Sequence, residues 1–428
     1  MLMNIFFCPC SLKMTCIFIF RRDLRLADNP ALIYALKTFE QVLPIFIYDH
    51  FQLTQSDTVR LEKSHRFIAA QEEGLDDLDS YLNAHGSHLC RYYGTPHKIV
   101  SWLIKKKSPV AVAFNADYSE YSQIRDAEIK RVCDEAKIKC IQAHDLLTHD
   151  GAPFDKRFHA FIQGVKPLGV SKNGRTNYVK NCSRVREAPP FLKITGEREF
   201  TRKIAIARLR QPFSDASEGQ HHRISVHIKL GLISQREVYR YGVTEKKLEL
   251  VKGMLWREFF FAAWRAHPQN YTFYDPRFSG IVWKNDPSEI KALWGARTGY
   301  PLIDAAVREL NRTGYMINRG RLIVGFFAVK ILRINPWLPL VGGQAYFSRK
   351  LTDCCYANNT GNWHWVSSDL LDASGQRFGK GWAGRPANPE LLRPGDAEYI
   401  ERWGRKKKIE PIVSWRERWR EWCEYTRE

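Results

Sequence analysis

Cys16-Ile-Phe-Ile-Phe20 is a short apolar run, and the polar stretch Arg21-Arg-Asp-Leu-Arg25 follows it directly. Four more short apolar runs follow, separated by longer stretches with apolar residues at steps of three and four. The short runs predict strands, and the amphipathic stretches predict helices. The five predicted strands are residues 16–20, 42–48, 88–93, 110–114 and 138–143. Strands that alternate with helices predict an α/β fold, a doubly wound parallel sheet over residues 15–145.

The loops after these strands carry no phosphate-binding motif. No G-x-G-x-x-G or Walker sequence follows any predicted strand. The sequence therefore disfavours the usual dinucleotide-binding and nucleoside-triphosphate-binding sites.

Residues 146–220 differ in composition from the preceding domain, because glycine, proline, serine and basic residues dominate them. This composition predicts a long interdomain linker. Beyond it, residues 221–428 show helical spacing without strand alternation, which predicts an all-α second domain. Its predicted helices include residues 232–241, 248–267, 301–313, 316–334 and 344–352. Twelve of the 13 tryptophans lie in residues 256–428, so stacking surfaces are concentrated there.

The charge balance is strongly basic. Lysine and arginine number 66 against 46 aspartate and glutamate, which gives a formal charge of +20. This surplus favours a polyanionic partner such as nucleic acid or an anionic membrane surface, with solvated surface charge as the alternative. Apolar residues at 44% and charged residues at 26% exclude a disordered chain.

The ten cysteines include no C-x-x-C pair. They predict reduced thiols in an intracellular protein of the nucleus or cytoplasm, with no metal site. The richest apolar run, residues 322–332, is interrupted by Lys330 and is too short to span a membrane. Residues 1–14 lack the positive n-region of a secretory signal and are expected to be a short extension.

Two aromatic clusters of the second domain have clear structural interpretations. Trp256, Phe260 and Trp264 recur at steps of four, which places them on one helical face. A core stripe is the simplest interpretation of this spacing. In Trp294-Gly-Ala-Arg-Thr-Gly-Tyr-Pro-Leu-Ile-Asp304, the proline is predicted to lie in a first helical turn.

Two polar clusters of the second domain contain groups that need a charged or hydrogen-bonding partner. Asn318-Arg-Gly-Arg321 leads into an apolar predicted helix, so a buried arginine there needs a carboxylate or phosphate. The run from Asp353 to Trp365 is rich in amides and is expected to be a loop. Its amides suit the edge of a planar heterocycle, although they also suit a capped turn.

Taken in order, these four clusters resemble the photolyase/cryptochrome family of flavoproteins, and the resemblance runs from about residue 15 to residue 422. The opening Phe20-Arg-Arg-Asp-Leu-Arg-Leu-Ala-Asp-Asn-Pro30 is also similar to that family's first strand and turn. The resemblance implies a Rossmann-like antenna domain and a helical FAD-binding domain. It implies light-driven electron transfer from reduced FAD to a pyrimidine dimer flipped out of damaged DNA. It leaves open whether the second, antenna chromophore is a folate or a deazaflavin.

The resemblance assigns the flavin side of the site. Asn358 corresponds to the amide that faces flavin N5, and Arg321 with Asp353 corresponds to the ion pair beside the isoalloxazine ring. A second acid is common in the family two residues after Asp353, where this chain has Cys355. Ser225 corresponds to a hydroxyl of the flavin-phosphate loop. The sequence around that hydroxyl departs from the family's pattern at His221-His222 and Val226.

The resemblance also assigns electron transfer and substrate binding. Trp363, Trp337 and Trp283 correspond to the three tryptophans that pass electrons from the surface to an oxidised flavin. The aromatic walls of the lesion cavity correspond to Trp256 and Trp365. Its polar neighbours correspond to Asn318 and Arg319. Stacking on a flipped base is worth about 1–3 kcal/mol.

Three features bear on the choice of function. Asn318-Arg319 is similar to the cyclobutane-dimer enzymes, whereas the (6-4) branch has a histidine acid in this neighbourhood and Ile317 and Asn318 supply none. The sequence ends at Glu428, from which we expect no long tail of the kind that light-signalling cryptochromes often carry. Against repair, Gly253 stands where the family usually places a lesion-contacting Glu or Gln.

We therefore expect a deoxyribodipyrimidine photo-lyase, a carbon–carbon lyase that acts as a monomer on damaged DNA without membrane association. A cryptochrome-like photoreceptor with little or no repair activity is the alternative. A divergent nucleic-acid-binding flavoprotein without repair activity is the third interpretation.

Overall fold

The computed structural model describes residues 14–53, 65–149, 161, 167–172, 174–180, 199–211, 224–266, 282–367, 388–405 and 409–425. The chain forms two compact units. Unit 1 comprises Met1–Phe51, Leu75–Leu146 and Ser171–Leu192, and unit 2 comprises Gln52–Gly74, Leu147–Val170 and Lys193–Glu428. The sequence-based division at 15–145, 146–220 and 221–428 stays a prediction.

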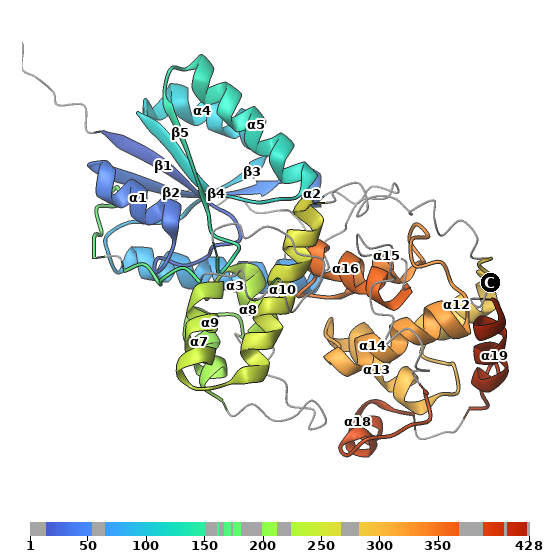
Figure 1. Ribbon diagram of the computed structural model, residues 1–428. Coiled ribbons are helices and arrows are strands. Elements are labelled where there is room, and N and C mark those ends of the chain that lie inside the picture. Colours follow the sequence, from blue (N-terminus) through green and yellow to red (C-terminus); the bar gives the residue numbers. More distant parts are fainter. Residues whose placement is uncertain are drawn as a thin grey trace, which may run out of the picture. The chain divides into compact units, whose positions relative to one another are not determined.

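Unit 1 is built on a five-stranded sheet (Figure 1). Its strands are β1 (Thr15–Phe20), β2 (Gln41–Asp49), β3 (Cys90–Gly94), β4 (Ala111–Ala116) and β5 (Lys139–His144). They lie in the order β3-β2-β1-β4-β5, and every neighbouring pair is parallel. The predicted doubly wound parallel sheet is confirmed.

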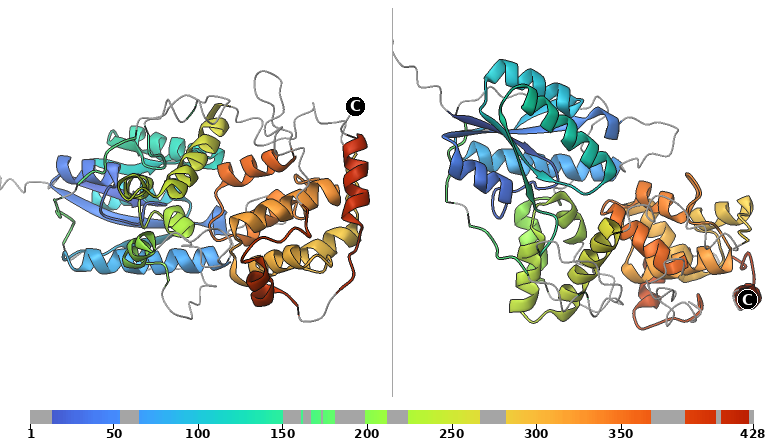
Figure 2. Two further views of the ribbon diagram at one scale, coloured as in Figure 1. Left: turned by 60° about the horizontal axis from the view of Figure 1, so that its bottom comes forward. Right: turned by 45° about the horizontal axis from the view of Figure 1, so that its top comes forward.

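Helices cover both faces of this sheet. Helices α4 (Pro96–Lys107) and α5 (Glu120–Glu135) lie side by side on one face, and α1 (Pro30–Thr38) lies on the other (Figure 2). Alternate residues of β1, Ile17 and Ile19, are buried in one core cluster with residues of α4 and α5. The intervening Phe18 is equally buried, as expected for a strand covered on both faces. Two further helices follow β2, α2 (His50–Leu53) and α3 (His65–Asn83).

Unit 2 has helices and no strand among its described residues. After the first part of α3, its helices continue with α7 (Arg202–Arg210), α8 (Ile224–Leu230), α9 (Gln235–Thr244) and α10 (Leu248–Ala266). The later ones are α12 (Pro287–Trp294), α13 (Pro301–Thr313), α14 (Asn318–Phe326), α15 (Gly343–Lys350), α16 (Tyr356–Ser367), α18 (Asp396–Trp403) and α19 (Trp415–Tyr425). No helix in the described ranges is long and apolar enough to cross a membrane.

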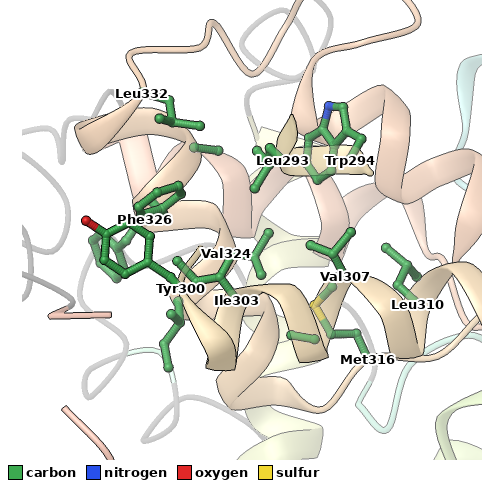
Figure 3. Packing of buried hydrophobic residues seen from close by; sticks show 14 of the residues in the cluster. Leu293, Trp294, Tyr300, Ile303, Val307, Leu310, Met316, Val324, Phe326 and Leu332 are labelled. Carbon is green, nitrogen blue, oxygen red and sulfur yellow. The ribbon is translucent and has the colours of Figure 1, made fainter. Parts of the chain in front are cut away.

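One core cluster of unit 2 includes residues of α12, α13 and α14. Figure 3 shows Ile303 of α13 beside Val324 of α14, and Val307 beside Met316. Pro301 occupies the first turn of α13, as the sequence predicts. Its fixed φ suits a helix start, and the position needs no backbone donor.

Two predictions about unit 2 are wrong. The single helix expected over residues 316–334 begins at Asn318 and changes at Phe327 to a five-residue π-helix, Phe327–Ile331. The run from Asp353 to Trp365 is largely the helix α16 and not a loop. Tertiary contacts outweigh its poor helix propensity, because Asn359 Nδ2 donates to Gln344 O and to Ser348 Oγ, both at 2.9 Å.

Candidate functional site

Three predicted flavin-side residues meet in unit 2. Arg321 Nη2 lies 2.8 Å from Asp353 Oδ2, and the Ser225 hydroxyl donates to the same oxygen at 2.7 Å. The Asp353 side chain is 4% exposed and that of Arg321 is 28% exposed. The sequence predicts an anion for Arg321, and Asp353 supplies it. A phosphate contact by Ser225 would require its hydroxyl hydrogen to leave Asp353, so that role stays a prediction.

Other groups fix the guanidinium in place. Arg321 Nε donates to Met316 O at 2.9 Å, and the Tyr315 ring centre lies 5.5 Å from the Arg321 Cζ. Burial opposes the charged form of Arg321, but the carboxylate of Asp353 outweighs it and holds the pKa of Arg321 above its ordinary value. The planar guanidinium is therefore oriented by contacts on both sides.

The amide of Asn358 is the clearest sign of a ligand. Asn358 lies in the first turn of α16, and its Oδ1 is buried without a hydrogen bond from any residue in the described ranges. A buried acceptor without a partner costs about 1–3 kcal/mol, so it favours a ligand that donates. A flavin ring N–H fits this demand. Cys355, which replaces the family's second acid, is half-buried just before α16, and its carbonyl accepts from Asn359 N at 2.8 Å.

The two predicted walls of the lesion cavity contact each other. The rings of Trp256, on α10, and Trp365, on α16, have centroids 5.1 Å apart at an interplanar angle of 88°. No flat group fits between rings at that distance, so the two indoles form a right-angled corner. Both rings pack against a cluster that contains Phe259 and Phe260.

A glycine sets the close approach of α10 and α16. A Cβ on Gly361 would overlap the ring of Phe260, which is 4% exposed. A larger residue would therefore push the two helices apart and open the corner between Trp256 and Trp365.

The other two predicted substrate residues lie at the start of α14. Asn318 is exposed and begins the helix. Arg319 Nη2 lies 2.6 Å from Asp396 Oδ2 and donates to Leu391 O at 3.0 Å. This guanidinium is engaged by its own chain, so a direct contact with substrate stays a prediction.

The three predicted relay tryptophans all touch the core cluster of unit 2. Trp363 is 3% exposed, whereas Trp337 and Trp283 are half-buried. The segments that carry the outer two are tied together, because Asn335 N donates to Asn285 Oδ1 at 2.8 Å. Their role as an electron relay stays a prediction.

Trp363 is held by a glycine of α15. A Cβ on Gly343 would overlap the six-membered ring of the Trp363 indole. On another side, the Phe347 ring centroid lies 5.1 Å from that of Trp363, at 69°. The indole therefore has little freedom to change its orientation.

Some residues of the site were not predicted. Tyr315 lies against Arg321, and Asn359 holds α16 to α15 through Ser348. Nothing in the sequence separates Asn359 from Asn358 until the segment is known to be helical. Their opposite roles follow from the roughly 100° turn per helical residue.

Family models and known proteins match this chain over most of its length. A family model described as DNA photolyase matches residues 16–157, and one described as the FAD binding domain of DNA photolyase matches residues 250–404. A deoxyribodipyrimidine photo-lyase from Synechococcus sp. is 27% identical over 434 residues, covering 90% of this chain and 86% of the relative. A cryptochrome DASH from Natronomonas pharaonis is 27% identical over 433 residues, covering 90% and 88%.

A solved structure matches this chain in both fold and sequence. The archaeal photolyase from Sulfolobus tokodaii, described with two FAD molecules, has a TM-score of 0.78 and 30% sequence identity, and the match covers 97% of this chain and 100% of that one. Its fold and sequence agree over nearly the whole length, and a photolyase FAD-binding model matches the helical region. The chain therefore belongs to the photolyase/cryptochrome family of flavoproteins and carries that family's FAD-binding domain.

Proposed function

We propose that this chain uses blue light to split cyclobutane pyrimidine dimers in DNA. The observation that supports this most directly is the corner of Trp256 and Trp365. Trp365 and Asn358 are seven residues apart on α16, so they lie on the same side of the helix, about 10 Å apart along its axis. A dimer stacked on the corner would lie within electron-transfer reach of a ring bound at Asn358.

The flavin side would work through positioning and charge. Bound, reduced FAD would supply one electron to the dimer under light and recover it after two carbon–carbon bonds break. Asn358 Oδ1 would accept a hydrogen bond from the bound ring. The ion pair of Arg321 and Asp353 would orient that ring from one side with little net charge.

The substrate side would work through stacking. Trp256 and Trp365 would present apolar faces to the two flipped bases, each worth about 1–3 kcal/mol. Asn318 is exposed and can hydrogen-bond a base edge. Arg319 would act indirectly, since its contact with Asp396 ties the start of α14 to the first turn of α18.

A photoreceptor without repair is the second candidate, and one position favours it. Gly253 lies one turn before Trp256 on α10, and a Cβ built there meets no atom within 4 Å. The position offers no polar side chain to a lesion, although it has room for one.

A blue-light assay on dimer-containing DNA tests the proposal. We expect dimers to disappear only in light and only with reduced, flavin-loaded protein. Undamaged DNA and dark incubation are the controls. A protein that binds FAD and dimer DNA but never splits the dimer would establish the photoreceptor alternative.

Restoring a carboxylate at position 253 should sharpen lesion recognition. We expect Gly253→Glu to raise the ratio of affinities for dimer and undamaged DNA by about tenfold, because one added hydrogen bond to a charged group is worth about 1.4 kcal/mol or more. Gly253→Ala is the matched control. It should stabilise α10 by about 0.5–1 kcal/mol and leave that ratio unchanged. Equal ratios for both variants would remove position 253 from the lesion site.

The surplus of positive charge should make DNA binding depend strongly on salt. Each phosphate contacted contributes about −0.9 to the slope of log K against log salt concentration, so about five contacts would give a slope of about −4.5. Titrations with undamaged duplex at several salt concentrations measure this slope. A slope near zero would show that the formal charge of +20 is only solvated surface charge.

A further inference from the structure

Helix α5 of unit 1 ends in a tightly hydrogen-bonded turn that leads into β5. Ile138 N donates back to Cys133 O at 3.0 Å, and Lys137 N donates to Asp134 O at 3.0 Å. Lys137 has the left-handed φ of 55° that closes such helix ends. In this arrangement, the residue after the left-handed one packs against the helix turn that accepts its N–H. The backbone therefore places Ile138 against the turn that carries Cys133.

The same geometry brings two thiols together. Cys140 is two residues beyond Ile138, and alternate strand residues share a face. Ile138 and Cys140 accordingly pack against the core cluster that contains Cys133, and the two thiols are close enough to shift each other's pKa. Cys133 is fully buried, whereas Cys140 is half-buried and reachable from solvent.

The two thiols differ in chemistry. The interaction with Cys133 favours the thiolate of Cys140 and lowers the pKa of that group, while the same interaction and burial raise the pKa of Cys133. Burial alone raises the pKa of Cys16, a buried thiol of β1, to about 12. Since the thiolate is the nucleophile, Cys140 combines access with reactivity, and Cys133 has neither by itself.

We propose that Cys140 and Cys133 are a reactive thiol and its resolving partner, which a peroxide oxidises to an intramolecular disulfide. The Cys140 thiolate attacks one peroxide oxygen, the O–O bond breaks, and Cys140 becomes a sulfenic acid as hydrogen peroxide is reduced to water. The Cys133 sulfur then attacks the Cys140 sulfur and releases a second water. Two thiols and one hydrogen peroxide thus give one disulfide and two waters. A thiol reductant reverses the change.

Trypsin offers a direct test of this site in the full chain. Cleavage after Lys130, Arg131, Lys137, Lys139 and Lys156 separates the two cysteines into the peptides 132–137 and 140–156. After hydrogen peroxide treatment, blocking of free thiols and digestion without reductant, we expect these peptides joined by a disulfide. In the untreated protein, we expect alkylation of Cys140 to be about tenfold or more faster than that of Cys133.

Variants separate the two roles. Cys133→Ser and Cys133→Ala should let Cys140 stop at the sulfenic acid, captured by a dimedone probe, or proceed to sulfinic acid. Cys140→Ser should leave Cys133 reduced. Cys90→Ser is the matched control, because Cys90 is a buried thiol of the same core cluster, and it should leave the joined peptides unchanged. Circular dichroism confirms that each variant is folded, and the serine and alanine forms at position 133 should agree.

Two results would overturn the proposal. One is oxidation of Cys140 to the same sulfenic or sulfinic product in the parent protein and in the Cys133 variants, without joined peptides. The other is a Cys140 that stays reduced under peroxide while other half-buried thiols, such as Cys423, are oxidised.

Discussion

Asp353→Ala is expected to lower the free energy of unfolding of unit 2 by about 3 kcal/mol and to release FAD. Removing one partner of a buried ion pair leaves the other charge uncompensated, at a cost of about 3–5 kcal/mol. The lower end applies because the Arg321 side chain keeps 28% exposure and can recover some hydration. The Ser225 hydroxyl loses its acceptor as well. Urea unfolding followed by circular dichroism, and the flavin absorbance per mole of purified protein, measure the two effects.

Two variants make this result specific. Asp353→Asn keeps an acceptor for Arg321 and Ser225 but removes the charge, so it should lie between alanine and the parent protein. Glu249→Ala breaks the exposed pair of Glu249 and Lys252, whose side chains are 64% and 59% exposed, and should cost about 0–1 kcal/mol. Stoichiometric FAD and unchanged stability in Asp353→Ala would remove this pair from the flavin site.

Trp363→Phe is expected to slow light-driven reduction of oxidised FAD by more than an order of magnitude. Phenylalanine is much harder to oxidise than indole, so the first step of the proposed relay fails. The smaller ring should cost only about 1–2 kcal/mol of stability, since an aromatic side chain still occupies the site between Gly343 and Phe347. Repair by chemically pre-reduced protein should persist, because that reaction draws no electron through Trp363.

Trp294→Phe is the matched control for packing. Trp294 is a buried tryptophan of the same core cluster, outside the proposed relay, and stacks on Tyr346 at 4.1 Å. It should lose at least as much stability, because its Nε1 also donates to Val341 O at 2.8 Å, yet photoreduce at the parent rate. Equal loss of photoreduction and of repair in Trp363→Phe would indicate that Trp363 only packs.

The sequence predicts the strands well, because β1, β2 and β4 are short apolar runs buried on both faces, as at Phe18. It fails at α16, where asparagine, threonine and glycine give a loop-like composition and tertiary contacts with α10, α14 and α15 stabilise the helix. Apolar spacing also does not record the change from α-helix to π-helix at Phe327.

The candidate site also has features that follow from local sequence patterns and features that do not. The need of Arg321 for an anion follows from its apolar surroundings, and the structure satisfies it with Asp353, 32 residues away. The contact of Ser225 with Asp353 joins residues 128 positions apart, and local patterns carry no information about such a pairing. Local patterns likewise give no sign of the ion pair between Arg319 and Asp396.

Helix α16 carries Asn358, Trp363 and Trp365 on a single rigid rod of twelve residues. A displacement of this helix would alter the proposed flavin contact, the first indole of the proposed relay and one wall of the proposed lesion site together. Substitutions that shift α16 should therefore be pleiotropic, with repair and photoreduction declining in proportion. If the proposed roles hold, changes confined to Trp256, on the separate helix α10, would alter lesion preference and leave the photoreduction chemistry intact. Divergence between repair and light sensing would then be easiest through α10, where Gly253 already differs from the family's usual residue.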